Sequence, residues 1–303
     1  MATQAHSSGI ALPFGVAALG IAAFSLMDAV MKGLSLEIGA YNALLWRTLA
    51  GAGIGGVLFL WHRVAWPGPA TMRVHLVRGI LSSFMAILFF WGLARVPMAQ
   101  AIALAFVAPL VALYLAALIL KEKIERSAVL ASLLGFAGVV VILGGQMEAQ
   151  LGREALHGSI AILCSAALYA YNIILMRQQA LLAGPVEIAF FMSAIMSACF
   201  LIAAPFLADL PAGEHVPGIL IAAILAFVSL MLLSWGYKRA EAQHLAPVEY
   251  TGFVWASLFG FLFFAEPVRP LTLIGAAMIV IACLVATRRS RGDAPMPAVE
   301  PGA

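Results

Sequence analysis

The segment PMAQAIALAFVAPLVALYLAALILKE, from Pro97 to Glu122, decides how the rest of the chain is interpreted. It carries no charge between Arg95 and Lys121, and Pro109 interrupts it near its middle. At a rise of about 1.5 Å per residue, a helix of this length crosses a hydrocarbon layer about 30 Å thick. The segment therefore predicts a membrane-spanning helix that is broken close to its proline.

A second segment of the same kind, EAQHLAPVEYTGFVWASLFGFLFFAE, begins 144 residues further along the chain (241 − 97 = 144). The constant offset predicts one unit written twice, with a first repeat over residues 1–145 and a second over 146–290. We expect the remaining residues, 291–303, to form a disordered cytoplasmic tail. The residues paired at this offset are Trp91 and Trp235, Gly92 and Gly236, Arg95 and Arg239, Gln100 and His244, Phe106 and Tyr250, Glu122 and Glu266, and Asp28 and Asn172.

The composition places the chain in the bilayer. Of its 303 residues, 64% are hydrophobic and 10% are charged, and the mean hydropathy is +1.03. A soluble domain carries about 25% charged residues, so a water-soluble fold could not bury this much apolar surface. Cys164, Cys199 and Cys283 all lie in apolar runs, which indicates neither a disulfide framework nor a metal site. No cofactor is expected.

Ten apolar windows predict an all-α membrane protein with ten transmembrane helices. The connections between them leave no room for a soluble domain. The N-terminus lacks the basic cluster and cleavage site of a signal peptide, so the first apolar run is expected to remain as a helix. The predicted spans are residues 13–33, 39–61, 74–94, 98–120, 127–145, 157–177, 186–207, 217–237, 245–265 and 270–287.

The Lys and Arg residues predict the orientation. Twelve of them fall on the side of the N-terminus and four on the opposite side, which indicates that both termini are cytoplasmic. The twelve are Arg63, Arg73, Arg78, Lys121, Lys123, Arg126, Arg177, Lys238, Arg239, Arg288, Arg289 and Arg291, and the four are Lys32, Arg95, Arg153 and Arg269.

The duplication has a geometric consequence. Each repeat contains five spans, and because five is odd the second repeat must enter the membrane upside down. Two inverted repeats around a site near the bilayer midplane are a recurring transporter architecture. The pattern therefore favours a carrier that works by alternating access.

Several motifs resemble the drug/metabolite transporter superfamily, and its ten-helix EamA-type branch in particular. They are the Trp91-Gly92 and Trp235-Gly236 pairs, LLWRTLAGAG around Arg47, GFAGVVVILGG over residues 135–145, and the ninth-span sequence LAPVEYTGFVWASLFGFLFFAE. The resemblance implies a bacterial inner-membrane exporter of amino acids, including aromatic ones and also threonine or methionine. Other members move riboflavin, nucleosides, S-adenosylmethionine or drugs. Phe191 stands opposite Arg47, so the two halves are not chemically equivalent.

Two acids within predicted spans are candidates for substrate or proton binding. Asp28 could line a cavity, or it could form an internal pair with Lys32 one turn later. Glu249 could couple export to proton entry, although an anchoring role near the interface is favoured. Gly252, Ala256 and Gly260 continue the Glu249 face and predict a close helix contact.

The other candidate substrate-binding residues divide into aromatic and polar groups. Aromatic rings in the spans that the family uses around its cavity could stack on a planar side chain. A zwitterion also needs an acceptor for its ammonium group and donors for its carboxylate. Arg47 is interpreted as structural, bound to a carbonyl or acid at the outer surface. The candidates are Phe106, Tyr171, Tyr250 and Trp255, with Asp28, Ser82, Ser83 and Asn172 as the polar groups.

Two other classes of protein were weighed against a transporter. A membrane-embedded enzyme needs clustered nucleophiles, paired acids or metal-ligand spacings, and the sequence shows none of them. A receptor or assembly subunit is disfavoured by the inverted duplication. The expected partners are a small-molecule substrate and the lipid bilayer, with no nucleic acid, and the protein is expected to be a monomer.

Overall fold

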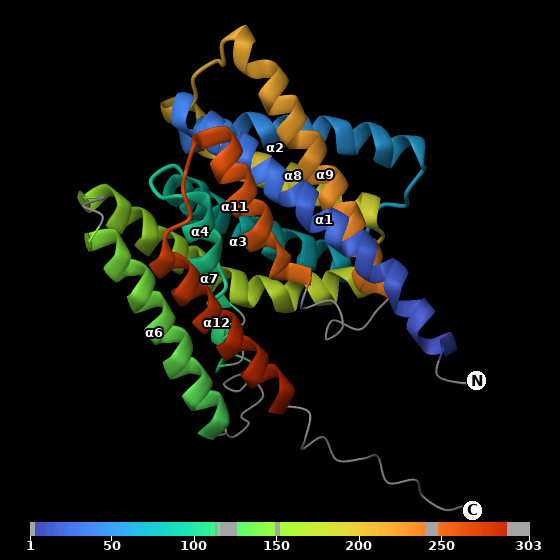
Figure 1. The fold of residues 1–303 in the computed structure, drawn as a ribbon. Helices are drawn as coiled ribbons and strands as arrows, with labels where there is room; N and C mark the ends of the chain where they lie inside the picture. Colours follow the sequence, from blue (N-terminus) through green and yellow to red (C-terminus); the bar gives the residue numbers. More distant parts are fainter. Residues whose placement is uncertain are drawn as a thin grey trace, which may run out of the picture.

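The computed structural model describes residues 4–108, 110–112, 114–115, 126–148, 152–239 and 248–289, and Figure 1 shows how they are arranged. These residues form helices joined by short connections, without a strand, which confirms the predicted fold class. The elements are α1 (Gln4–Glu37), α2 (Gly39–Trp61), α3 (Pro69–Leu93), α4 (Met98–Ala105), α6 (Arg126–Glu148), α7 (Gly152–Leu182), α8 (Pro185–Leu207), η1 (Gly213–His215), α9 (Val216–Arg239), α11 (Thr251–Phe264) and α12 (Pro270–Arg289).

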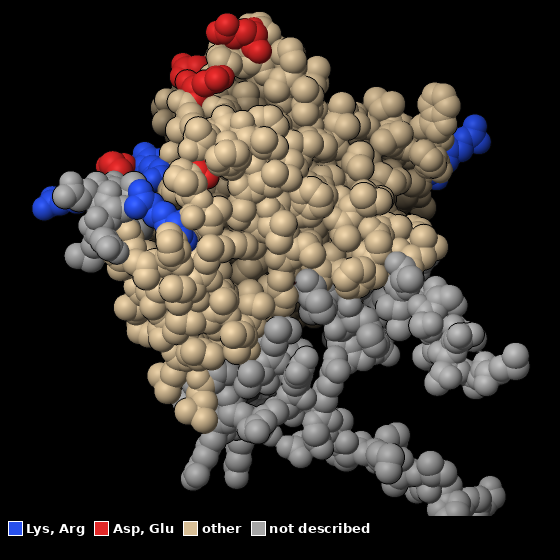
Figure 2. All heavy atoms as spheres, viewed as in Figure 1, with Lys and Arg blue, Asp and Glu red and all other residues tan. Residues whose placement is uncertain are grey.

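The helices have the lengths and the surface of a multi-pass membrane protein. Six of those described are long and apolar enough to cross a bilayer, and four shorter apolar stretches bring the number to ten (6 + 4). Large apolar side chains stay on the surface, with Ile202 79% and Phe261 63% exposed. Figure 2 shows a broad uncharged surface with the charged side chains at its edges. Such a surface is stable in lipid and not in water.

The packing follows a two-fold pattern. The most extensive contacts join α1 to α9, α3 to α7, α2 to α8 and α6 to α12. The first five spans are α1, α2, α3, α4 and α6, and the last five are α7, α8, α9, α11 and α12. When each helix is replaced by its counterpart in the other repeat, the α1–α9 pair becomes the α7–α3 pair. The α2–α8 and α6–α12 pairs stay the same. The two repeats are therefore structural equivalents, and they contact each other along all four of these helix pairs.

Helices α6 and α12 lie side by side at one edge of the bundle (Figure 1). A Cβ added at Gly138 would lie 2.7 Å from the carbonyl oxygen of Gly275, and one at Gly275 would lie 2.6 Å from that of Gly138. Only glycine allows two backbones to approach this closely. This contact holds the fifth and tenth spans together.

Helix α4 is followed by an interruption of the helix at Phe106 and Val107. Its regular part ends at Ala105, and Phe106 and Val107 form a turn before helical residues resume. The Val107 amide donates to Leu104, three residues back rather than four. Pro109 lies just beyond this turn in sequence, and a proline has no backbone N–H and disfavours helix in the residue before it.

The connection between α1 and α2 is a single residue, Ile38. Helix α1 ends at Glu37, and Gly39 begins α2 with φ +79°, a left-handed conformation that glycine adopts without strain. The Ile38 amide donates to Leu34 at 2.9 Å. The two helices therefore diverge from one tight turn.

Two of the charges in this count are buried inside helices. Arg78 is 4% exposed within α3, which begins at Pro69, five residues before the predicted boundary at 74, as is common for a proline in the first helical turn. Lys32 is 3% exposed within α1. The predicted charge bias becomes eleven against three (12 − 1 and 4 − 1). Predictions about Pro109, Glu122, His244 and residues 291–303 fall outside the described residues.

Candidate functional site

Helix α1 buries a row of polar side chains on one face. Ser25, Asp28 and Lys32 are three and four residues apart, so they lie on the same side of the helix, and each is less than 5% exposed. A Cβ at Gly252 of α11 would lie 3.9 Å from the Ser25 hydroxyl oxygen. This face is therefore turned toward α11. Ionisable groups persist at such a depth when they face a partner or a cavity.

Lys32 is paired with Glu266 rather than with Asp28. Its ammonium group donates to Glu266 Oε1 and, at 2.7 Å, to the carbonyl oxygen of Val96. Glu266 Oε2 accepts from the amide of Met98 at 2.8 Å. We call this contact, which joins α1, the start of α4 and the end of α11, the Lys32–Glu266 latch. The alternative in which Asp28 and Lys32 neutralise each other is wrong, because the lysine is bound elsewhere.

Asp28 and Arg47 interact electrostatically but form no ion pair. Among the described residues, neither carboxylate oxygen of Asp28 has a hydrogen-bond partner, and neither has Arg47 Nε. The Arg47 guanidinium lies 6.0 Å from the centre of the Phe90 ring. It is eight residues inside α2 (47 − 39), or about 12 Å. The expectation that Arg47 binds a carbonyl or acid at the outer surface is therefore wrong.

A second buried polar group joins α3 to α7. Arg78 Nε donates to Asn172 Oδ1 at 3.2 Å, and its Nη1 donates to Gln179 Oε1. The Ser82 hydroxyl lies 3.5 Å from the same Asn172 oxygen, whereas the Ser83 hydroxyl donates to the backbone of its own helix. The structure thus brings two predicted residues, Ser82 and Asn172, into one cluster around Arg78.

His75 extends this cluster to α8. Its Nδ1 lies 2.5 Å from Gln179 Nε2, its Nε2 lies 3.0 Å from a carboxylate oxygen of Glu187, and its ring stacks on Phe191. Neither His75 nor Arg78 was recognised from the sequence. The available signal was the spacing of His75, Arg78 and Ser82, which repeats the three-and-four spacing of the polar row on α1.

The predicted aromatic residues divide into three groups. Phe106 and Tyr250 pack edge to face at 5.2 Å between α4 and α11, so they occupy the interface between the repeats. Trp255 stacks on Phe259 of its own helix. Tyr171 is 39% exposed and is the predicted aromatic residue with the most exposed side chain.

Glu249 lies at the start of the helical segment that leads into α11. It interacts electrostatically with Tyr169 of α7, as does Arg78, so it belongs to the same half of the interior as the Arg78 cluster. Gln100 donates to the buried Ser159 hydroxyl at 3.4 Å, which ties α4 to α7. In the described part of the chain, no three His, Cys, Asp or Glu side chains are grouped so that they could hold a metal ion.

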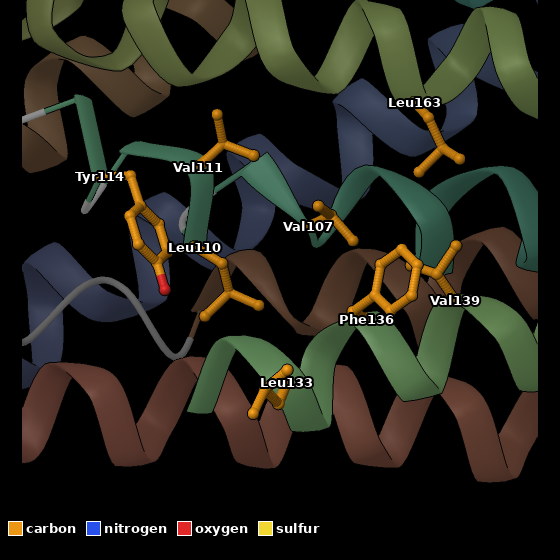
Figure 3. Close-up of a pocket in the computed structure, with 8 residues that line it drawn as sticks. All are labelled: Val107, Leu110, Val111, Tyr114, Leu133, Phe136, Val139 and Leu163. Carbon is orange, nitrogen blue, oxygen red and sulfur yellow. The ribbon is translucent and has the colours of Figure 1, made fainter. Parts of the chain in front are cut away.

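The cavity drawn in Figure 3 is apolar and lies away from these charges. It measures about 440 Å³ and lies between the residues that follow α4, one face of α6, and α7. It contains none of the predicted substrate-binding residues. Its lining residues are Val107, Leu110, Val111, Tyr114, Leu133, Phe136, Val139 and Leu163.

Comparison with known proteins gives a family-level match. The model of the EamA-like transporter family matches the chain twice, over residues 13–144 and 156–288, as expected for two repeats. The chain resembles a crystal structure with a TM-score of 0.61 at 21% identity, covering 94% of this chain and 99% of the other. At that identity the likeness concerns the fold alone.

Three characterised relatives cover nearly the whole chain. The chain is 28% identical to a pseudopaline exporter of Pseudomonas aeruginosa, over 91% of this chain and 96% of that protein. It is 27% identical to a riboflavin transporter of Rhizobium johnstonii, over 88% and 87%. It is 25% identical to an S-adenosylmethionine uptake transporter of Rickettsia bellii, over 93% and 94%. These relatives are named for different substrates, and one is named as an exporter whereas another is named for uptake.

Proposed function

Because this chain belongs to the EamA-like transporter family, we propose that it exports small amphipathic metabolites across a bacterial inner membrane. The preferred substrates are amino acids, including aromatic ones and also threonine or methionine. The observation that carries this proposal is that the Asp28 carboxylate oxygens and Arg47 Nε are buried without hydrogen-bond partners among the described residues, in a bundle whose interior also holds the Phe106 and Tyr250 rings. Such a site suits a solute with a charged end and an apolar end.

The substrate would lie between the two repeats. Asp28, Ser82, Ser83 and Asn172 would contact its polar end, and Phe106, Tyr250 and Trp255 its apolar end. Tyr171, at 39% exposed, is left out of this assignment. Asp28 and Glu249 are the groups proposed to carry a coupled proton.

The transport cycle would be alternating access, with the two repeats exchanging conformations around a fixed site. We propose that the boundary between the repeats lies near residue 145 and that both termini are cytoplasmic. A bundle of ten helices can enclose such a site without a partner, so the protein is proposed to act as a monomer. The family assignment favours transport over a membrane-embedded enzyme.

A second candidate substrate class follows from the relatives. Riboflavin and S-adenosylmethionine are planar or charged solutes of larger size, and the named transporters for them match most of this chain. S-adenosylmethionine carries the same α-ammonium and α-carboxylate groups as a free amino acid, so a site for one accommodates the polar end of the other.

The deciding experiment is uptake of labelled solutes into vesicles that contain the purified protein. Tryptophan, phenylalanine, threonine and methionine should exchange across the membrane, and protein-free vesicles are the control. Exchange of riboflavin alone would replace the amino-acid assignment with the second candidate. S-adenosylmethionine is tested beside them, and exchange of none of the six solutes would remove both candidates.

Proton coupling is tested in the same vesicles with an imposed pH gradient. If Asp28 or Glu249 carries the proton, Asp28→Asn or Glu249→Gln should exchange substrate but no longer respond to the gradient. If both variants respond as the parent does, neither acid carries the proton.

A further inference from the structure

We propose that Asp28 and Arg47 bind the two charged groups of a zwitterion. The Asp28 carboxylate would accept hydrogen bonds from the substrate's ammonium group, and the Arg47 guanidinium would donate to its carboxylate. This inference rests on the proposed function and narrows it to substrates that carry both charges close together, as α-amino acids do. It also gives Arg47 a binding role in place of the structural role expected from the sequence.

The two residues lie at similar distances from the turn that joins α1 to α2. Asp28 is nine residues from the end of α1 (37 − 28), and Arg47 is eight residues from the start of α2 (47 − 39). These separations correspond to about 14 Å and about 12 Å along the two helices. Half of a hydrocarbon layer about 30 Å thick is about 15 Å, so two helices that cross the bilayer from this turn would carry both side chains toward the midplane, where carriers with inverted repeats bind their substrates.

Both groups have buried polar atoms without a hydrogen-bond partner among the described residues. Asp28 is 1% exposed, and its two carboxylate oxygens have no hydrogen bond among the described residues. Arg47 Nε is likewise buried without a hydrogen bond. The two charges interact through space but do not form an ion pair. A buried charge is costly when unpaired, and a zwitterion placed between these groups would satisfy both at once.

The two buried Lys and Arg side chains of the described spans already have partners. Lys32 donates to Glu266 and to the carbonyl oxygen of Val96. Arg78 donates to Asn172 and Gln179. Because the Asn172 side-chain oxygen is occupied by Arg78, Asn172 is a poorer partner for a substrate than Arg47. Arg47 is therefore the cation to which we assign the substrate carboxylate.

This assignment predicts a specificity pattern. A substrate that lacks the carboxylate would leave Arg47 unpaired, and one that lacks the ammonium group would leave Asp28 unpaired. A site with charges built to be hydrogen-bonded discriminates strongly against an analogue that lacks one of the partners. Three ligands with the same ring test this pattern: phenylalanine, phenethylamine (no carboxylate) and 3-phenylpropionate (no ammonium).

Equilibrium binding of these three ligands to the purified protein, measured by calorimetry, tests the site. The parent should bind phenylalanine about 10- to 100-fold more tightly than either analogue, the loss expected for one charge-assisted hydrogen bond. Arg47→Gln should bind phenylalanine and phenethylamine alike and still disfavour 3-phenylpropionate. Asp28→Asn should bind phenylalanine and 3-phenylpropionate alike and still disfavour phenethylamine. Arg95→Gln, which removes an exposed guanidinium paired with Glu154, is the matched control and should behave as the parent does.

The possible failures can be told apart. A parent that binds no amino acid overturns the proposed function. A parent that binds phenylalanine and either analogue equally overturns the zwitterion site alone, and this comparison needs no variant to fold. Variants that lose all three ligands while remaining folded, or that bind all three as the parent does, show that Asp28 and Arg47 do not hold opposite ends of the substrate.

Discussion

Replacing Glu266 with glutamine should open the contact between α1, α4 and α11. The change leaves Lys32, which is 3% exposed, as a buried cation whose remaining partner in the latch is the Val96 carbonyl oxygen. Breaking a fully buried pair costs about 3–5 kcal/mol. Because Glu266 is 19% exposed, solvent replaces part of the lost interaction, and we expect about 2 kcal/mol. If the latch forms in one conformation of the carrier, that energy changes the ratio of latched to open molecules about 30-fold.

Spin labels at the ends of α1 and α11 measure this change directly. Leu36 and Phe263 are 55% and 59% exposed, so cysteines there accept a label without entering the interior. The native cysteines Cys164, Cys199 and Cys283 are first replaced with serine. In the labelled parent the distance distribution should have one short component, and Glu266→Gln should add a longer one.

The matched control is Glu154→Gln, which breaks the pair between Arg95 and a glutamate that is 72% exposed. Exposed pairs contribute about 0–1 kcal/mol, so the distance distribution should stay unchanged. The double variant Lys32→Met with Glu266→Leu removes both charges and should recover part of the lost stability. An unchanged distance distribution in Glu266→Gln, together with an unchanged melting temperature, would refute the assignment of the latch.

Two further predictions concern the interior and the orientation. Gln179→Leu removes one partner each from Arg78 and His75. It should destabilise the protein by about 1–3 kcal/mol, measured as a lower melting temperature. Gln178→Leu, at the exposed neighbouring position, is the control and should have little effect. Leu210, between α8 and η1, is 87% exposed, and Trp66, between α2 and α3, is 70% exposed. In intact cells a membrane-impermeant thiol reagent should label Leu210→Cys. The same reagent should not label Trp66→Cys. Labelling of both from outside would contradict the proposed orientation.

The sequence was sufficient for those features that depend on local pattern. The second span, predicted over 39–61, is α2 (Gly39–Trp61), because apolar length is counted along the chain. Gly252, Ala256 and Gly260 form the buried face of α11, as their four-residue spacing predicts. These features depend only on the helical period and on small side chains at the buried positions, and both can be read from a short stretch of sequence.

The partners of the buried charges could not be predicted in the same way. Lys32 and Glu266 are 234 residues apart, and nothing in the spacing around Lys32 distinguishes that partner from Asp28 one turn away. Arg78 is counted with the cytoplasmic charges because it lies near the start of the predicted span 74–94, and its position along the chain does not show that its side chain is turned into the bundle. Helical spacing shows which residues share a face, whereas the identity of the opposing helix depends on how all the spans pack.

The one-residue connection at Ile38 constrains how the first two helices can move. With Gly39 in a left-handed turn and a single residue between the helices, the end of α1 and the start of α2 stay together whatever the rest of the bundle does. The main packing partners of the two helices are different, α9 for α1 and α8 for α2. A movement of the α1–α9 pair during the transport cycle is therefore passed to the α2–α8 pair through the backbone at Ile38.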